Sequence, residues 1–98
     1  MRARSCAENK QKMANRLEIE RLCALLVDQA VLAQRNYVFV ADESDGVVVR
    51  RGPHVRGLWR CFGGEFGWIP AGYAEPTHYV RDAEAAMRYT LVVLATAP

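Results

Sequence analysis

The chain has 98 residues, of which 51% are hydrophobic and 24% are charged. This composition is typical of a globular domain, because disordered chains carry fewer apolar residues and more net charge. The formal net charge is only +2, from 13 basic and 11 acidic residues, so overall charge does not indicate a nucleic-acid-binding protein. The length excludes a multidomain enzyme and a membrane channel.

The cysteine count and the apolar segments indicate a compartment. Cys6, Cys23 and Cys61 are odd in number and form no Cys-x-x-Cys pair, which argues against a disulfide framework and a zinc site. The densest apolar stretch, 22–33, is shorter than the ~20 residues that span a bilayer. No apolar signal segment follows the basic start of the chain. We therefore expect a cytoplasmic protein with reduced thiols and no membrane partner.

The first predicted element is a long helix. Residues 1–12 hold four basic residues and no apolar cluster, so we expect a flexible basic tail there and a single α+β domain over residues 13–98. No Gly or Pro occurs from Met13 to Arg35, which favours helix throughout. At ~100° per residue, one apolar face forms the expected core stripe. Its members are Ile19, Leu22, Cys23, Leu26, Ala30 and Ala33.

Leu25 and Leu32 lie seven residues apart and outside that stripe. A helix that is apolar over most of its circumference is normally covered on more than one side. The cover is either the C-terminal helix of the same chain or a second copy, which would make a homodimer through the first helix.

Strand-forming residues follow, separated by turn residues. We expect a loop over Arg50–Gly57, and a final helix over Ala83–Ala95 with Asp82 as its cap. The expected strands are Tyr37–Ala41, Val47–Val49, Leu58–Phe62 and Phe66–Ile69, with Thr77–Val80 as a fifth strand or a lead-in to the last helix.

This layout predicts an α+β fold: a long N-terminal helix, a four- or five-stranded antiparallel meander and a C-terminal helix. One helix cannot cover both faces of a sheet, so we expect both helices on one face and the other face open.

The residues that could support catalysis are few. The only serines are Ser5 and Ser44, and the two histidines, His54 and His78, lie in loop-like contexts. No His, Cys or Asp spacing suits a metal, and no Gly-rich loop joins a strand to a helix. We therefore expect a protein that is not an enzyme and holds neither cofactor nor metal.

The segment Leu58 to Glu75 contains Gly67-Trp68-Ile69-Pro70-Ala71-Gly72-Tyr73, preceded by Trp59. It resembles the second half of Src-homology-three domains, which carry a Trp-bearing strand, a tight turn and a Gly-aromatic-Ile-Pro-x-x-Tyr run. The resemblance covers residues 58–75 and implies, as an alternative fold, a small barrel flanked by helices. It also implies that Pro70 and Tyr73 line a groove for proline-rich peptides. The chain departs from the family where Leu58 takes the place of the groove Trp.

Period-two alternation assigns the aromatic residues to faces. Phe66 and Trp68 share one face of their strand, as Tyr37 and Phe39 do of theirs. We expect the aliphatic residues to face the helices and the aromatic residues to face outward as a protein-contact surface. The predicted partner-binding residues are Trp59, Phe66, Trp68, Pro70 and Tyr73.

A second group is basic. Arg50, Arg51, Arg56 and Arg60 fall within eleven residues that contain no acidic residue. Together with the basic tail they would suit an acidic partner or a nucleic-acid backbone.

The function that these features favour is a non-catalytic protein-binding domain. Its size and layout look like those of small accessory proteins of phages and other mobile elements. Anti-CRISPR-type inhibitors, which block a host complex by surface occlusion, are one such group. The alternative function is a nucleic-acid-binding module that uses the Arg50–Arg60 segment and the tail.

Overall fold

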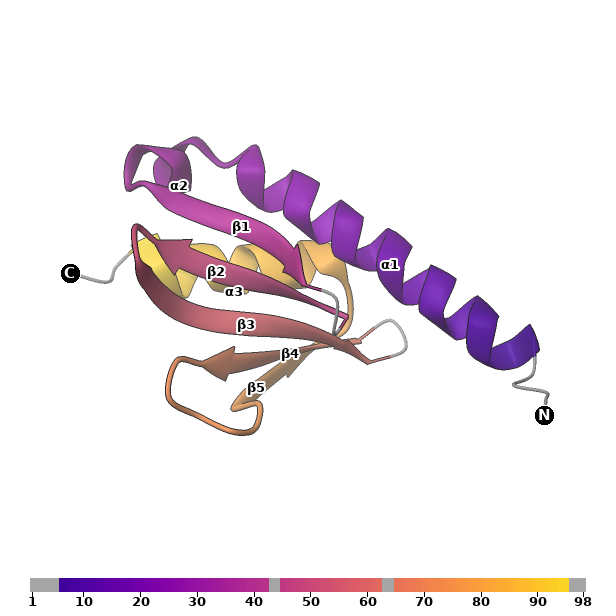
Figure 1. Cartoon of the computed structure of the whole chain (residues 1–98). Coiled ribbons are helices and arrows are strands. Elements are labelled where there is room, and N and C mark those ends of the chain that lie inside the picture. Colours follow the sequence, from indigo (N-terminus) through magenta and orange to yellow (C-terminus); the bar gives the residue numbers. More distant parts are fainter. Residues whose placement is uncertain (1–5, 43–44, 63–64, 96–98) are drawn as a thin grey trace.

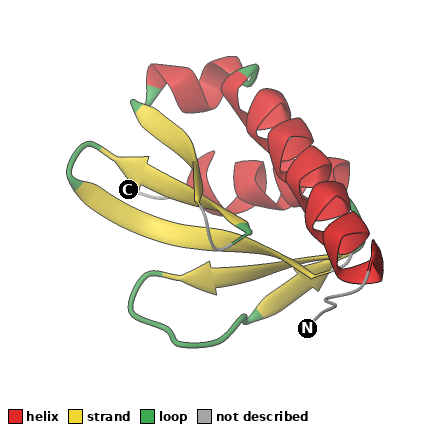
Figure 2. Cartoon of the chain, turned by 45° about the vertical axis from the view of Figure 1, so that its right-hand side comes forward, coloured by secondary structure: helices red, strands yellow, loops and turns green. Residues whose placement is uncertain are grey.

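A computed structural model of the chain describes residues 6–42, 45–62 and 65–95. Within these residues, three helices pack on one face of a five-stranded sheet, and no helix covers the opposite face (Figure 1, Figure 2). The α+β fold, the antiparallel meander and the open face are therefore confirmed. In chain order the elements are α1 (Cys6–Val27), α2 (Ala30–Gln34), β1 (Tyr37–Asp42), β2 (Gly46–Arg51), β3 (His54–Phe62), β4 (Glu65–Pro70), β5 (His78–Val80) and α3 (Ala83–Ala95).

The sheet has the simplest order, β1-β2-β3-β4-β5, with every neighbouring pair antiparallel. β1 and β5 form its two edges and do not pair within the described residues, so the alternative fold, a small barrel, is wrong. The expected fifth strand is present as β5. Residues 43–44 and 63–64, which belong to the expected turn segments between strands, lie outside the described residues.

The segment from Arg50 to Gly57, expected to be a loop, is instead a β-hairpin. β2 continues to Arg51, Gly52 and Pro53 form the turn, and β3 begins at His54. Gly52 has a φ of 60°, a conformation that glycine adopts without steric cost. The register shifts between Val49 and Arg50, which is a β-bulge.

The first helix also differs from its expected limits. It begins at Cys6, so residues 6–12, assigned to a flexible tail, are helical, while residues 1–5 lie outside the described residues. It ends at Val27 because Gln29 has extended backbone (φ −86°, ψ 107°). The Gln29 carboxamide donates to the Leu25 carbonyl at 3.1 Å, where a continuing helix would place the Gln29 backbone N–H.

This break decides which residues reach the core. Leu32 is fully buried, whereas Ala30 and Ala33, which belonged to the expected stripe, are exposed. Ile19, Leu22 and Leu26 are buried as expected, and Cys23 and Leu25 pack against the core as half-buried residues. A self-association seam that uses Leu32 is therefore wrong, and the cover on this side comes from the same chain.

The two long helices lie mainly over different parts of the sheet. α1 contacts β1, β2 and β3, whereas α3 contacts β4 and β5 and reaches β3 through Trp59. Arg21 on α1 pairs with Glu84 on α3 at 3.0 Å. Asp82 caps α3 as expected, because its carboxylate accepts a hydrogen bond from the Ala85 N–H at 2.8 Å. The N-terminal part of α1 continues beyond the sheet, which gives the described chain its 50 Å long axis (Figure 1).

Candidate functional site

The aromatic residues expected to face outward lie in the core. Trp59 and Phe66 are fully buried and Trp68 is 4% exposed, so none of the three is available to a partner. The alternation within each strand was assigned correctly, but the faces were reversed. In β1, Tyr37 points inward and is buried, while Val38 and Val40 are exposed.

Trp59 shows why the large rings lie beneath the helices. Its indole N–H donates to Thr90 Oγ1 on α3 at 2.8 Å, so the ring is buried without an unpaired donor. Its ring also contacts those of Phe66, Trp68 and Tyr89, at centroid distances of 6.3, 5.1 and 5.8 Å. Burial of rings of this size contributes more hydrophobic free energy than burial of valines on the same face would.

Gly57 makes room for the second indole. A Cβ at Gly57 would overlap the six-membered ring of Trp68. Without one, the Trp68 ring lies across β3 and reaches the centre of the covered face.

Pro70 and Tyr73, the groove residues that the family resemblance implies, lie at the end of β4 and in the loop after it. Pro70 is half-buried and Tyr73 is 62% exposed. They remain accessible, but neither tryptophan lies beside them at the surface, because both indoles are in the core.

The other face of the sheet carries an aliphatic surface. The register aligns Val40, Val48, Leu58 and Ile69 in one row across four strands, and Val38, Arg50 and Val55 in the next row. Val38, Val40 and Val55 are 44%, 43% and 49% exposed, and the other apolar members are half-buried. We define the open face as these six apolar residues: Val38, Val40, Val48, Val55, Leu58 and Ile69.

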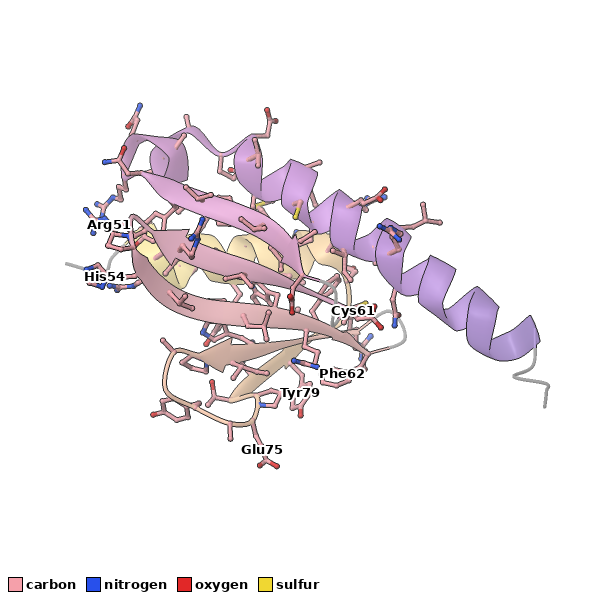
Figure 3. The ribbon with its side chains drawn as sticks, in the orientation of Figure 1. Arg51, His54, Cys61, Phe62, Glu75 and Tyr79 are labelled. Carbon is pink, nitrogen blue, oxygen red and sulfur yellow. The ribbon has the colours of Figure 1, made fainter. Side chains whose placement is uncertain are left out.

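A ring cluster continues this surface toward β5. Phe62 and Tyr79 have ring centroids 6.3 Å apart and point toward one another (Figure 3). Gly67 lies between them in the sheet, and a Cβ there would approach Pro76 and Phe62 at 2.9 and 3.1 Å. We call Phe62, Pro76 and Tyr79 the ring cluster. It is the only place among the described residues where aromatic side chains lie on the open side of the sheet.

The basic group divides between the two sides of the sheet. Arg50 follows the buried Val49 and Arg60 follows the buried Trp59. Because successive residues of a strand point to opposite sides, Arg50 and Arg60 lie on the open side. Arg51 lies on the opposite side, with its guanidinium 5.6 Å from the centroid of the Tyr37 ring. The four arginines therefore do not form one basic surface.

The remaining chemistry of the described residues is sparse. No group of three His, Cys, Asp or Glu side chains within them is placed to hold a metal ion. Partial burial, and secondarily the nearby Glu20 carboxylate, raises the pKa of the Cys23 thiol above its ordinary value. Cys61 is buried and its thiol donates to Asn15 Oδ1 at 3.5 Å. Over the described part of the chain, none of the helices combines the length and apolar character needed to cross a membrane.

Comparison with known proteins gives no match: no family model, no curated protein and no solved structure is similar to this chain. The candidate site therefore rests on the residues of this chain alone. The sequence reasoning missed the members of the open face. The signal for them was present in the Tyr-Val-Phe-Val and Val-Val-Val runs, which alternate between faces.

Proposed function

We propose that the protein is a non-catalytic protein-binding domain whose open face docks on a partner protein. The observation that supports this most strongly is the row Val40, Val48, Leu58 and Ile69, which crosses four strands on the side without helices. Apolar residues scattered singly over a surface are ordinary, but a contiguous row flanked by further valines is typical of a contact surface.

The polar residues near this row suit a protein interface. Arg50 lies within the neighbouring row and Arg60 adjoins the ring cluster. Protein interfaces combine an apolar centre with a polar rim in which arginine and aromatic residues are enriched. A flat sheet face with β-branched side chains loses little side-chain entropy when it is covered, because valine has few rotamers to lose.

The biological role that we propose for this binding is inhibition of a host complex by surface occlusion. Its support is the contiguous apolar row of the open face, which suits docking on the surface of a partner.

The test uses matched lysine substitutions and affinity capture from cell lysate, with and without nuclease. Val38→Lys and Val40→Lys place charge on the open face at exposed positions, so the fold should persist. Val27→Lys makes the same change at a residue that is 63% exposed at the end of α1. We expect nuclease-resistant capture of a protein that both open-face variants abolish and Val27→Lys preserves. Capture that all three variants retain would contradict the proposal.

A photo-crosslinking residue at position 40 or 27 locates the contact directly. We expect a crosslink to the same captured protein from position 40 and none from position 27. The reverse pattern would move the contact to the helical side.

A second candidate function, nucleic-acid binding, is favoured by the ring cluster. Phe62 and Tyr79 are exposed rings with Arg60 on the same side, an arrangement that can stack on bases and neutralise a phosphate. Under this function, captured material would be lost on nuclease treatment. Tyr79→Ala would then weaken binding to single-stranded DNA more than Tyr73→Ala, a matched change at the other highly exposed tyrosine.

A further inference from the structure

The β2–β3 hairpin holds a pocket on the side of the sheet opposite the open face. It is an open hollow with a volume of ≈ 360 Å³. Its lining residues are Asn36, Arg51, Gly52, His54 and Arg56. Two arginines, a histidine and an asparagine therefore line one hollow, and none of the five lining residues is acidic.

The β-bulge brings the second arginine into this group. Val49 pairs with Gly57 and Arg50 pairs with Val55, which leaves Arg56 as the extra residue of β3. With strict alternation from Gly57, Arg56 would lie on the open side. The extra residue interrupts the alternation between Gly57 and Val55, and His54 and Arg56 both line the pocket.

The first arginine is positioned by the core. Arg51 is half-buried and lies over the ring of Tyr37, which is itself 6% exposed. A cation held over a buried ring has fewer accessible rotamers, so less entropy is lost when it binds a ligand. Figure 3 shows Arg51 and His54 side by side at this end of the sheet.

We propose that this pocket binds the phosphate group of a small phosphate monoester. Planar guanidinium groups match the oxygen geometry of phosphate and donate charge-assisted hydrogen bonds to it. The His54 ring and the Asn36 carboxamide supply further N–H donors. The site is independent of the proposed partner surface, because it uses neither the six open-face residues nor the ring cluster.

The test is an NMR titration of the full chain with inorganic phosphate, adenosine 5′-monophosphate and adenosine, at constant pH and ionic strength. We expect the two phosphates, and not adenosine, to shift the backbone amides of Gly52, His54 and Arg56 saturably. Arg56→Gln should weaken phosphate binding about tenfold, which corresponds to the loss of one charge-assisted hydrogen bond. Arg50→Gln is the matched control on the other side of the same hairpin and should change the affinity less than about twofold.

The comparison of ligands identifies the group that is recognised. Equal affinities for inorganic phosphate and the monophosphate, or tighter binding of the monophosphate, both support a phosphate site. Three results would overturn it: no saturable shift with either phosphate, binding of adenosine as tight as that of its monophosphate, or equal weakening by Arg56→Gln and Arg50→Gln.

If Arg56→Gln perturbs the hairpin, His54→Gln tests the same pocket from a neighbouring position, and the amide spectrum of each variant reports its fold. Loss of phosphate binding leaves the partner proposal intact, because the capture experiment changes Val27, Val38 and Val40, none of which lines the pocket.

Discussion

The two faces of the sheet, built from the same strands, differ in the side chains that they carry. The face beneath the helices holds Trp59, Phe66 and Trp68 at 4% exposure or less, with the one indole donor of Trp59 satisfied by Thr90. The open face carries valine, leucine and isoleucine, with members that are more than 40% exposed. The contrast teaches that the bulkiest side chains of the strands, and not the outward-facing valines, lie beneath the helices.

The largest expected difference in stability is between the loss of a buried aromatic ring and the loss of an exposed one. Trp68→Ala should lower the free energy of unfolding by ~3–5 kcal/mol, because it leaves a cavity in the core. Phe62→Ala, at a side chain that is 45% exposed, should cost less than about 1 kcal/mol. Urea denaturation of both variants measures the difference. Equal losses would contradict the assignment of the two faces.

Glycines on the two faces give the next largest contrast. Gly57→Ala should destabilise the fold by ~1–3 kcal/mol, because the new methyl group meets the buried Trp68 ring. Gly67→Ala meets Pro76 and Phe62 on the open side, where a loop and an exposed ring can move, so we expect less than about 1 kcal/mol. Thermal unfolding of the pair tests this, and a larger loss at Gly67 would show that the ring cluster is rigid.

Thr90→Val keeps the side-chain shape and removes the acceptor for the Trp59 indole. The buried N–H then has no partner, so we expect a loss of ~1–2 kcal/mol in the free energy of unfolding. In a Trp59→Phe background the same change should cost much less, since the donor is absent. A double-mutant cycle in urea measures this coupling, and strict additivity would exclude the hydrogen bond as a source of stability.

The smallest effect concerns the Cys23 thiol, which belongs to neither face. Its pKa is raised in the folded state, so the folded chain holds the thiol proton to higher pH than the unfolded chain does. This contribution favours the fold only below the ordinary thiol pKa, and the fold loses stability as pH rises from there through the raised pKa. In a Cys6→Ser/Cys61→Ser variant at pH 8, alkylation of Cys23 should be slower in the native state than in urea. Equal rates would contradict the raised pKa.

Much of the fold follows from sequence because its signals are local. Residues Tyr37–Ala41 and Ala83–Ala95 form a strand and a helix as expected, and Asp82 caps the helix. The helix break at Gln29 was missed because it contains no Gly or Pro. The side-chain carboxamide of Gln29, and not its backbone N–H, donates to the Leu25 carbonyl. Sequence composition does not reveal such a hydrogen bond.

The candidate site was harder to predict, since it depends on which way the sheet faces. The period-two alternation of a strand shows which residues share a side. It does not show which side is covered, because the covering helices are distant in sequence. The division of the four arginines between the two sides of the sheet was not predicted for a related reason. A single extra residue, Arg56, changes the alternation, and bulges have no reliable sequence signature.

That extra residue also affects how the chain tolerates changes in length. Beyond the bulge, only the hairpin tip remains to be paired, whereas the stretch from Leu58 to Arg60 pairs with both β2 and β4. A deletion or insertion of one amino acid at the tip would be absorbed there, without moving the tryptophans against each other. Evolution can therefore remodel the tip of this hairpin while the layer beneath the helices stays in register.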